Sequence, residues 1–141
     1  MQDEILQIYK KLNKTIILVT HDIEEAIKLG SKIVVLKEGE IMTSGGRDET
    51  VFHNKNEFVN DFIGNKGFLS YLNLTEVKNY ISPFDENYKQ QEGQVHVNSE
   101  DKLIVGIRLC LENGLNSVLV RDENGNAVGQ FELASLHSMK F

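Results

Sequence analysis

The run TIILVT at residues 15–20 constrains the fold of this chain more than any other stretch. It carries no charge, and five of its six residues are β-branched. Uninterrupted apolar runs of this kind are typical of strands buried on both faces of a parallel sheet. Such a strand needs further strands beside it, because its backbone groups must be paired and its faces covered. The run therefore predicts the interior of a sheet.

Helical patterns flank this run on both sides. Residues 2–13 place apolar side chains on one face at helical spacing, with acidic residues early and lysines late. Asp22 can cap a helix through DIEEAIKLG, where Glu25 stands three residues later and completes a capping box. Gly30 then ends this helix.

A second strand and a hairpin follow. Residues 32–36, KIVVL, predict another buried strand, and KEGEIMTSG predicts a hairpin with a glycine turn that carries Ile41 outward. Helix–strand–helix–strand order indicates an α/β fold in which a crossover joins parallel strands. Two buried strands and two helices do not complete a domain, since their apolar faces need further strands on at least one side. This half therefore predicts the tail of something larger.

The middle of the chain is predicted to be helical. Residues 46–64 predict two short helices, and residues 66–81 predict two more helical stretches. The expected packing anchors are Phe52, Phe58, Phe62 and Ile63. Residues 82–94 are polar, contain the only proline and lack periodicity, so they predict a linker or a long loop.

A second unit is predicted after this linker, in the order β-α-β-β-α. Residues 95–98 predict a strand, residues 100–113 an amphipathic helix, and residues 117–122 a second strand. An Asn-Gly turn at 123–126 leads to an antiparallel partner at 127–133, and ASLHSM predicts a final short helix. The helix residues expected to point inward are Leu103, Ile104, Ile107 and Leu111.

Charge and composition argue against two functional classes. Residues 1–64 carry 8 Lys/Arg against 11 Asp/Glu and residues 65–141 carry 7 against 10, so each half has a net charge of −3. A nucleic-acid surface would show a basic stripe instead. No apolar run approaches the roughly 18–20 residues that span a bilayer, and the N-terminus lacks a basic signal-peptide start. The sequence thus predicts a cytoplasmic protein or a peripheral subunit.

Few titratable residues suggest a site. Cys110 cannot form an internal disulfide, and it is either a small core residue or a nucleophile whose base is not evident. His53, His96 and His137 lie far apart without ligand spacing, so no metal site is predicted. His21 follows a predicted buried strand, at the end where open α/β sheets place ligand-contacting groups. The residues alone leave open whether His21 is structural or functional.

The stretch TIILVTHDIEEAIKLGSKIVVLKEGEI resembles the end of the nucleotide-binding subunit of ABC transporters, with Thr-His-Asp similar to that family's switch-histidine segment. The segment through NEFVNDFIG resembles the extension typical of ATPases from importers of glycine betaine, carnitine, choline and related osmoprotectants. The β-α-β-β-α unit is similar to a CBS repeat, which these ATPases often carry. The resemblance covers residues 3–43, 56–64 and 95–137.

The resemblance implies that His21 contacts the γ-phosphate of ATP and positions the attacking water with a glutamate. A GxxxxGK[ST] loop, an LSGGQ-like signature and an apolar strand ending in Asp-Glu for Mg²⁺ are not found in the 141 residues. We therefore expect a C-terminal fragment, natural or truncated, that neither binds ATP tightly nor hydrolyses it alone. ATP and Mg²⁺ would belong to the complete subunit, which works with a membrane permease and a second ATPase subunit at the inner face of the cell membrane.

The resemblance also implies a fold class and a division of the chain. The expected fold is α/β, the truncated end of a P-loop ATPase sheet followed by a small α+β CBS-like unit. Residues 1–64 would be the remnant of the ATPase domain, residues 65–94 a helical connector and linker, and residues 95–141 a single CBS-like repeat.

CBS repeats generally work in pairs, with adenosine-type nucleotides or charged surfaces at the groove between them. A single repeat forms such a groove only as a homodimer, which would bind cyclic di-AMP or another adenine nucleotide. The residues expected at the groove are Val95, Val97, Val118, Val120 and Phe131. A structural appendage that merely dimerises explains the unit equally well. The alternative for the whole chain is a stand-alone regulatory module, and the solute of the parent importer is not determined.

Overall fold

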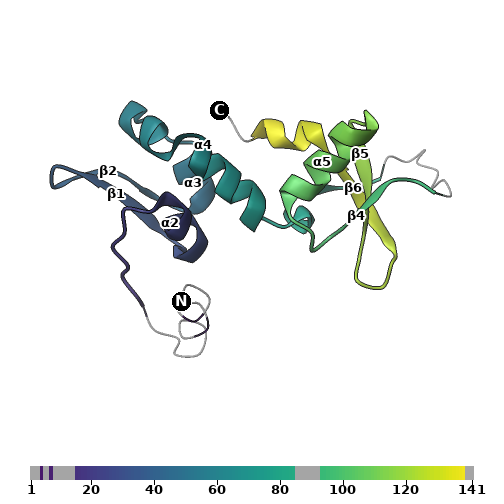
Figure 1. Ribbon diagram of the computed structural model, residues 1–141, viewed down its shortest axis with the longest axis horizontal. Coiled ribbons are helices and arrows are strands. Elements are labelled where there is room, and N and C mark those ends of the chain that lie inside the picture. The colour runs from purple at the N-terminus through teal and green to yellow at the C-terminus, as the bar shows by residue number, and fades with distance from the viewer. Residues whose placement is uncertain (1–3, 5–6, 8–14, 85–92, 139–141) are drawn as a thin grey trace. The chain divides into compact units, whose positions relative to one another are not determined.

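The computed structural model describes residues 4, 7, 15–84 and 93–138 of the chain (Figure 1). These residues form an α/β fold that divides into two compact units, a first that ends at Tyr71 and a second that begins at Leu72. The helix predicted for residues 2–13 lies outside the described residues, apart from residues 4 and 7, and so does most of the predicted linker. In the described part of the chain, no helix is long and apolar enough to cross a membrane.

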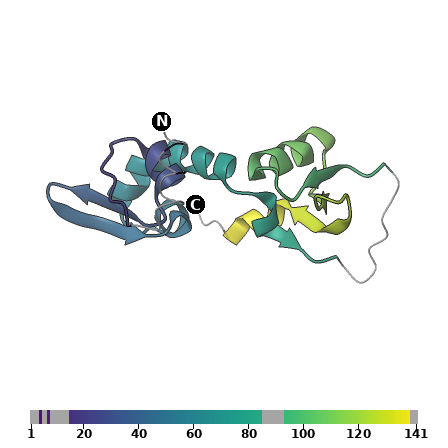
Figure 2. The same cartoon turned by 90° about the horizontal axis from the view of Figure 1, so that it is seen from below.

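The first unit contains a hairpin and several helices. Helix α2 (Ile23–Leu29) leads into strands β1 (Ile33–Lys37) and β2 (Glu40–Gly45). Helix α3 (Arg47–Phe52) and all but the last three residues of α4 (Glu57–Leu74) follow. Both views place α2 and α3 near the end of the hairpin that lies away from its turn (Figures 1 and 2). Helix α4 is broken at Gly64, whose φ of 44° and ψ of −149° separate two helical pieces.

The predicted hairpin is confirmed, and its turn explains the glycine. Strands β1 and β2 pair antiparallel, with Lys37 opposite Glu40 and only two residues between them. Both of these residues, Glu38 and Gly39, have positive φ values, 52° and 84°. Two-residue hairpin loops favour this geometry because its twist matches that of the strands. Ile41 points outward as predicted and is 65% exposed.

An aromatic cluster holds the core of the first unit. The Phe52 ring meets Phe68 and Tyr71 edge to face, at centroid distances of 6.1 and 4.7 Å. Of the predicted anchors, Phe52 and Ile63 are buried, as expected. The prediction is wrong for Phe62, which is 46% exposed. The buried face of the first piece of α4 runs through Val59 and Ile63, four residues apart, so Phe62 lies beside that face.

Two of the predicted anchors on α4, Phe58 and Phe62, stack on each other at the surface. The rings of Phe58 and Phe62 stack with centroids 5.8 Å apart, and the Lys37 ammonium lies 4.3 Å from the centroid of Phe58. Phe58 is half-buried rather than buried. A cation over an aromatic face is attracted by the ring quadrupole, which helps to keep the stack at the surface.

The prediction of a buried strand at residues 15–20 is wrong for this structure. These residues belong to no strand, and Figure 1 shows the segment as an extended trace that leads into α2. Ile17 and Val19 are 88% and 90% exposed. The physical reason is a lack of neighbours, since the only strands that the structure describes in the first unit, β1 and β2, pair with each other. An apolar run becomes an interior strand only when other strands supply ladder partners on both sides.

Strand β1 forms where it was predicted, but it is buried on one face only. Ile33 and Val35 are buried, whereas Val34 and Leu36 are 45% and 62% exposed. Successive strand residues point to opposite faces, so a two-stranded hairpin with helices on one side leaves the other side open. The expectation of burial on both faces is therefore wrong, for the same lack of neighbours.

The second unit contains a four-stranded mixed sheet in the order β3-β6-β5-β4. Its strands are β3 (Ile81–Ser82), β4 (His96–Asn98), β5 (Ser117–Arg121) and β6 (Ala127–Glu132), and helix α5 (Leu103–Asn113) links β4 to β5. The pair β4–β5 is parallel, and the other two pairs are antiparallel. Helix α5 lies along one face of the sheet (Figure 2). The 3₁₀ helix η2 (Leu133–Ser138) follows β6, so the predicted β-α-β-β-α order is observed.

Long-range backbone bonds explain two differences from the predicted elements. Residues 75–81 were predicted as helix but form the 3₁₀ helix η1 (Val77–Tyr80) and the start of β3. The N–H of Val77 donates to the Asp101 carbonyl (2.8 Å), and the N–H of Leu103 donates to the Thr75 carbonyl (2.9 Å). These bonds hold both segments in a pairing that a helix would break, so α5 begins at Leu103 rather than at residue 100.

The buried face of α5 also differs from the prediction. It consists of Leu103, Gly106 and Cys110, while Leu111 is 69% exposed and was wrongly predicted to point inward. The Phe131 ring explains this choice, because a Cβ placed on Gly106 would lie 3.0 Å from its Cδ1 atom. Only a residue without a side chain lets the helix approach the ring this closely.

Candidate functional site

Local hydrogen bonds shape the turn that presents His21. The Asp22 carboxylate caps α2, accepting from the N–H groups of Glu24 (2.9 Å) and Glu25 (3.3 Å). The N–H of Asp22, which a capping box would direct to the Glu25 carboxylate, donates instead to Thr20 Oγ1 at 3.0 Å. The predicted cap is thus confirmed and its reciprocal half is not. A side-chain cap of this kind stabilises a helix by about 1 kcal/mol.

His21 lies at the surface of this turn. It is exposed, and it lies between Thr20 and Asp22, whose polar side chains are both used within the turn. An exposed imidazole can donate a hydrogen bond to an oxyanion or accept one from water. The turn fixes the backbone at His21 while leaving the imidazole accessible, which suits a group that meets a ligand from outside this unit.

The five residues predicted for a nucleotide groove meet in the second unit, four of them in its core. Val97, Val118, Val120 and Phe131 are each at most 2% exposed. The register pairs Val97 with Val120 and Val118 with Phe131, so all four share the sheet face that α5 covers. Val95 precedes β4, is half-buried, and accepts a hydrogen bond from the Leu119 N–H at 3.2 Å.

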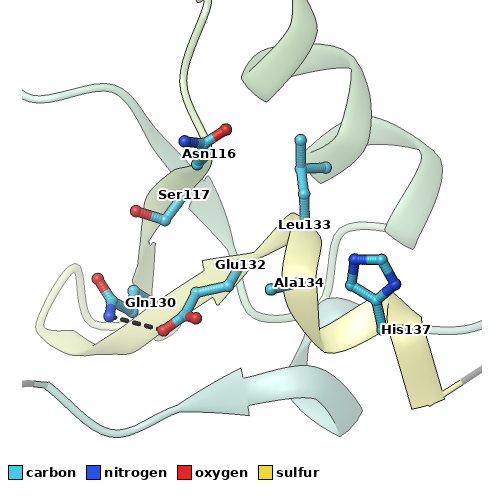
Figure 3. A pocket seen from close by; sticks show the side chains of 7 residues that line it. All are labelled: Asn116, Ser117, Gln130, Glu132, Leu133, Ala134 and His137. Carbon is cyan, nitrogen blue, oxygen red and sulfur yellow. Dashed lines mark hydrogen bonds between the residues drawn. The ribbon is translucent and has the colours of Figure 1, made fainter.

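An open hollow of about 500 Å³ lies beside η2 on the other face of this sheet (Figure 3). Its lining residues are Asn116, Ser117, Gln130, Glu132, Leu133, Ala134 and His137. Figure 3 shows Ser117 on β5 next to Gln130 and Glu132 on β6, with His137 contributed by η2. The Gln130 amide donates to Glu132 Oε1 at 2.8 Å, which orients both side chains.

The chemistry of the hollow is that of a polar hydrogen-bonding site. It offers a carboxylate, an imidazole, two amides and a hydroxyl, together with the apolar side chains of Leu133 and Ala134. The sequence pattern pointed to the apolar members of these strands and did not assign Asn116 or His137 to a groove. Ser117 and Glu132 lie on this face by parity, since strand residues of opposite parity to a buried face must line the other one.

Cys110 is a core residue and not an activated nucleophile. It is fully buried on α5, and burial raises the pKa of its thiol above the ordinary value. A raised pKa lowers the fraction of reactive thiolate. Among residues 4, 7, 15–84 and 93–138, no group of three or more His, Cys, Asp or Glu side chains is arranged to hold a metal ion.

No model of a known protein family matches the chain. The chain is 35% identical over 135 residues to the glycine betaine/carnitine/choline transport ATP-binding protein OpuCA of Bacillus subtilis (strain 168). The matched region covers 94% of this chain and 33% of the relative. It is 34% identical over 132 residues to the carnitine transport ATP-binding protein OpuCA of Listeria monocytogenes serotype 1/2a (strain 10403S), covering 93% and 31% of the two chains.

A third relative shows the same proportion. The osmoprotectant import ATP-binding protein OsmV of Salmonella typhimurium (strain LT2) is 29% identical over 129 residues, which cover 92% of this chain and 32% of the relative. The chain therefore spans about a third of the length of the curated relatives that it matches.

Proposed function

Because this chain corresponds to the C-terminal part of the ATP-binding subunits of osmoprotectant ABC importers, we propose that its first unit works as part of such an ATPase. In this proposal His21 contacts the γ-phosphate of bound ATP. The observation that carries it is the turn described above, in which the Thr20 hydroxyl and the Asp22 carboxylate fix the backbone and leave the imidazole exposed.

An imidazole in this position has a clear chemical use. In phosphoryl transfer, catalysis consists mainly of positioning and of stabilising charge on the phosphoryl oxygens. His21 would donate a hydrogen bond to one of these oxygens and help to hold the attacking water. Binding of the phosphates and of Mg²⁺ requires a phosphate loop and a metal-binding strand, and neither pattern occurs in the 141 residues. The chain by itself is therefore proposed to lack ATPase activity.

The proposal extends to the domains and partners of the chain. Residues 1–64 would be the ATPase-derived part, residues 65–94 a connector, and residues 95–141 a CBS-like repeat. A complete subunit would pair with a second ATPase subunit and bind a membrane permease, which places it in the cytoplasm at the inner face of the cell membrane. It would never touch the transported solute, so the ATPase part does not select it.

A restored subunit tests the role of His21. Fusing the first two thirds of OpuCA from B. subtilis ahead of the present chain supplies the region that the match leaves out. We expect His21→Ala to abolish ATP turnover of this fusion while ATP binding persists. His53→Ala is the matched control, because His53 is also an exposed histidine of the first unit, and it should leave turnover unchanged. Normal turnover in the His21→Ala fusion would contradict the assigned role.

A regulatory role for the second unit is the second candidate, supported by the hollow beside η2. In this alternative the unit dimerises and binds cyclic di-AMP or another adenine nucleotide through Ser117, Gln130 and Glu132. Calorimetry of the 141-residue chain with ATP and with cyclic di-AMP separates the two candidates. Saturable binding that Gln130→Ala weakens would favour the regulatory role, and absence of heat with both nucleotides would leave the ATPase role alone.

A further inference from the structure

Arg47 lies at the electrostatically unfavourable end of its own helix. It is the first residue of α3, and the positive end of the helix dipole disfavours a cation there. The next two residues, Asp48 and Glu49, carry the acidic side chains that suit this end. A residue that breaks such a local rule in a folded protein is expected to serve a tertiary or functional contact instead.

The contact that Arg47 makes is with the C-terminal end of α2. Its Nε–H donates to the carbonyl oxygen of Gly30 at 3.2 Å. Gly30 is the C-cap of α2, and carbonyl groups at a helix C-terminus carry partial negative charge without a partner in the helix. Arg47 is half-buried, which strengthens the attraction by reducing the exposure of its charge to water. The guanidinium thus supplies a donor and a positive charge to the end of α2 that lies away from His21.

A second contact places the same half of α2 against α4. Ile27 is 1% exposed, and a Cβ built on Gly67 would lie 3.4 Å from the Ile27 Cδ1 atom. An apolar contact of this kind is non-directional, so by itself it lets the helix tilt about Ile27. The bond from Arg47 to Gly30 adds a direction, because a hydrogen bond weakens steeply when it is bent. By contrast, His21 and residues 15–19 are exposed.

The length of α2 converts a small tilt into a displacement that matters for chemistry. Asp22, the N-cap, lies five positions before Ile27, which is about 7.5 Å at the helical rise of about 1.5 Å per residue. A tilt of about 10° about Ile27 therefore moves the turn that carries His21 by about 1.3 Å. A misplacement of about 1 Å can lower the rate of an enzymatic reaction about 100-fold.

We propose that Arg47 is a positioning residue for His21. By fixing the direction of α2, the bond from Arg47 to Gly30 places the His21 imidazole at the phosphoryl oxygen that it contacts. The inference rests on the proposed function for the role of His21. The effect of Arg47 on the direction of α2 does not depend on that function.

The first test measures turnover of the fusion of the first two thirds of B. subtilis OpuCA with the present chain. Arg47→Met removes the guanidinium at nearly unchanged side-chain length. We expect kcat to fall about 10- to 100-fold while KM for ATP stays within about twofold, because the phosphate loop of the fusion still binds the nucleotide. Arg47→Lys keeps the positive charge near Gly30 and should recover part of the lost kcat.

The second test measures the direction of α2 in the 141-residue chain through residual dipolar couplings of its backbone N–H groups. Arg47→Met should tilt α2 relative to β1 and β2 by about 10° or more, or lower its orientational order. Arg108→Met is the matched control, because Arg108 is an exposed arginine of α5, and it should leave the couplings and kcat unchanged. Val59→Ala lowers stability through a core position of α4 and should leave kcat within about twofold where the fusion is folded.

The outcomes separate this inference from the proposed function. An unchanged direction of α2 in Arg47→Met overturns the inference, and so does an unchanged kcat in a fusion whose turnover depends on His21. If Arg47→Met lowers kcat no more than Val59→Ala does, the loss reflects stability and the positioning role is overturned. Normal turnover of the His21→Ala fusion contradicts the proposed function, and a tilted α2 in Arg47→Met then supports the anchoring of α2 by Arg47 without it.

Discussion

The contact between Gly106 and Phe131 allows a quantitative test of the core of the second unit. Phe131 is fully buried, and a Cβ on Gly106 would lie 3.0 and 3.1 Å from two of its ring carbons. Gly106→Ala gains about 1 kcal/mol of helix propensity but overpacks the core, which costs about 1–3 kcal/mol. We therefore expect this substitution alone to leave stability unchanged or to lower it by up to about 2 kcal/mol.

Replacing the Phe131 ring with a smaller side chain should make Gly106→Ala stabilising instead of destabilising. Phe131→Leu removes about three carbon atoms from the core, which at about 0.8 kcal/mol each lowers stability by about 2 kcal/mol. With the ring gone, the methyl group that Gly106→Ala introduces would fill part of the space, and the gain in helix propensity would remain. The double variant Gly106→Ala, Phe131→Leu should then be more stable than the sum of the single effects by about 1–3 kcal/mol.

A double-mutant cycle measures this coupling. Urea unfolding followed by circular dichroism gives the stability of each variant, and hydrogen exchange of the β5 amides reports the second unit separately. Gly125→Ala combined with Phe131→Leu serves as the control, because no atom lies within 4 Å of a Cβ placed on Gly125. Its effects should add. Additivity within about 0.5 kcal/mol for the Gly106 pair as well would refute the close packing of the helix on the ring.

Three further predictions concern single sites. Gly129→Ala should lower stability by about 3 kcal/mol, because Gly129 has a φ of 155° and its added Cβ would lie 2.6 Å from a backbone carbonyl oxygen of β3. Gly125→Ala, where the only cost is backbone strain at a φ of 81°, should lower it by about 1 kcal/mol. Equal urea midpoints for the two variants would contradict this prediction. Thr50→Val should raise stability by about 1 kcal/mol in thermal unfolding, because the Thr50 hydroxyl is buried and has no hydrogen-bond partner among the described residues. Hydrogen bonds from the Asn126 side chain, and secondly from the Asn126 backbone N–H, lower the pKa of Asp122 from its ordinary value of 3.8. The stability contributed by ionised Asp122 is therefore present above pH 3.8 and is lost as the pH falls through the lowered folded-state pKa. The drop in the urea midpoint between about pH 5 and pH 2 should be smaller in Asp122→Asn than in the unsubstituted chain.

Much of the local structure could be predicted because its causes lie within a few residues. Asp22 caps α2 through N–H groups two and three positions away, and Gly39 closes the β1–β2 hairpin within a two-residue turn. Gly114 ends α5 in a left-handed conformation, with its N–H bonded back to the last turn of that helix. The β-α-β-β-α order of the second unit followed from the same kind of signal.

The candidate sites divide along the same line. The Asp22 cap next to His21 could be anticipated, because it depends only on the N–H groups of Glu24 and Glu25. The burial of Phe131 under α5 could not be anticipated, because it depends on how α5 packs on the sheet. That packing requires the space that Gly106 leaves for the Phe131 ring. The hollow beside η2 was not predicted, because it combines residues of β5 and β6 with His137 of η2, which a local pattern does not bring together.

The sequence by itself determined which segments are helices, turns and hairpins in most of the chain, because capping, glycine turns and periodicity act over a few residues. It also determined that TIILVT is fit for the interior of a sheet. Only the tertiary structure decided that residues 15–19 are exposed and that α5 turns Cys110 rather than Leu111 inward. Burial depends on which distant segments are present to cover a surface, and strand pairing requires neighbours that a local pattern does not contain.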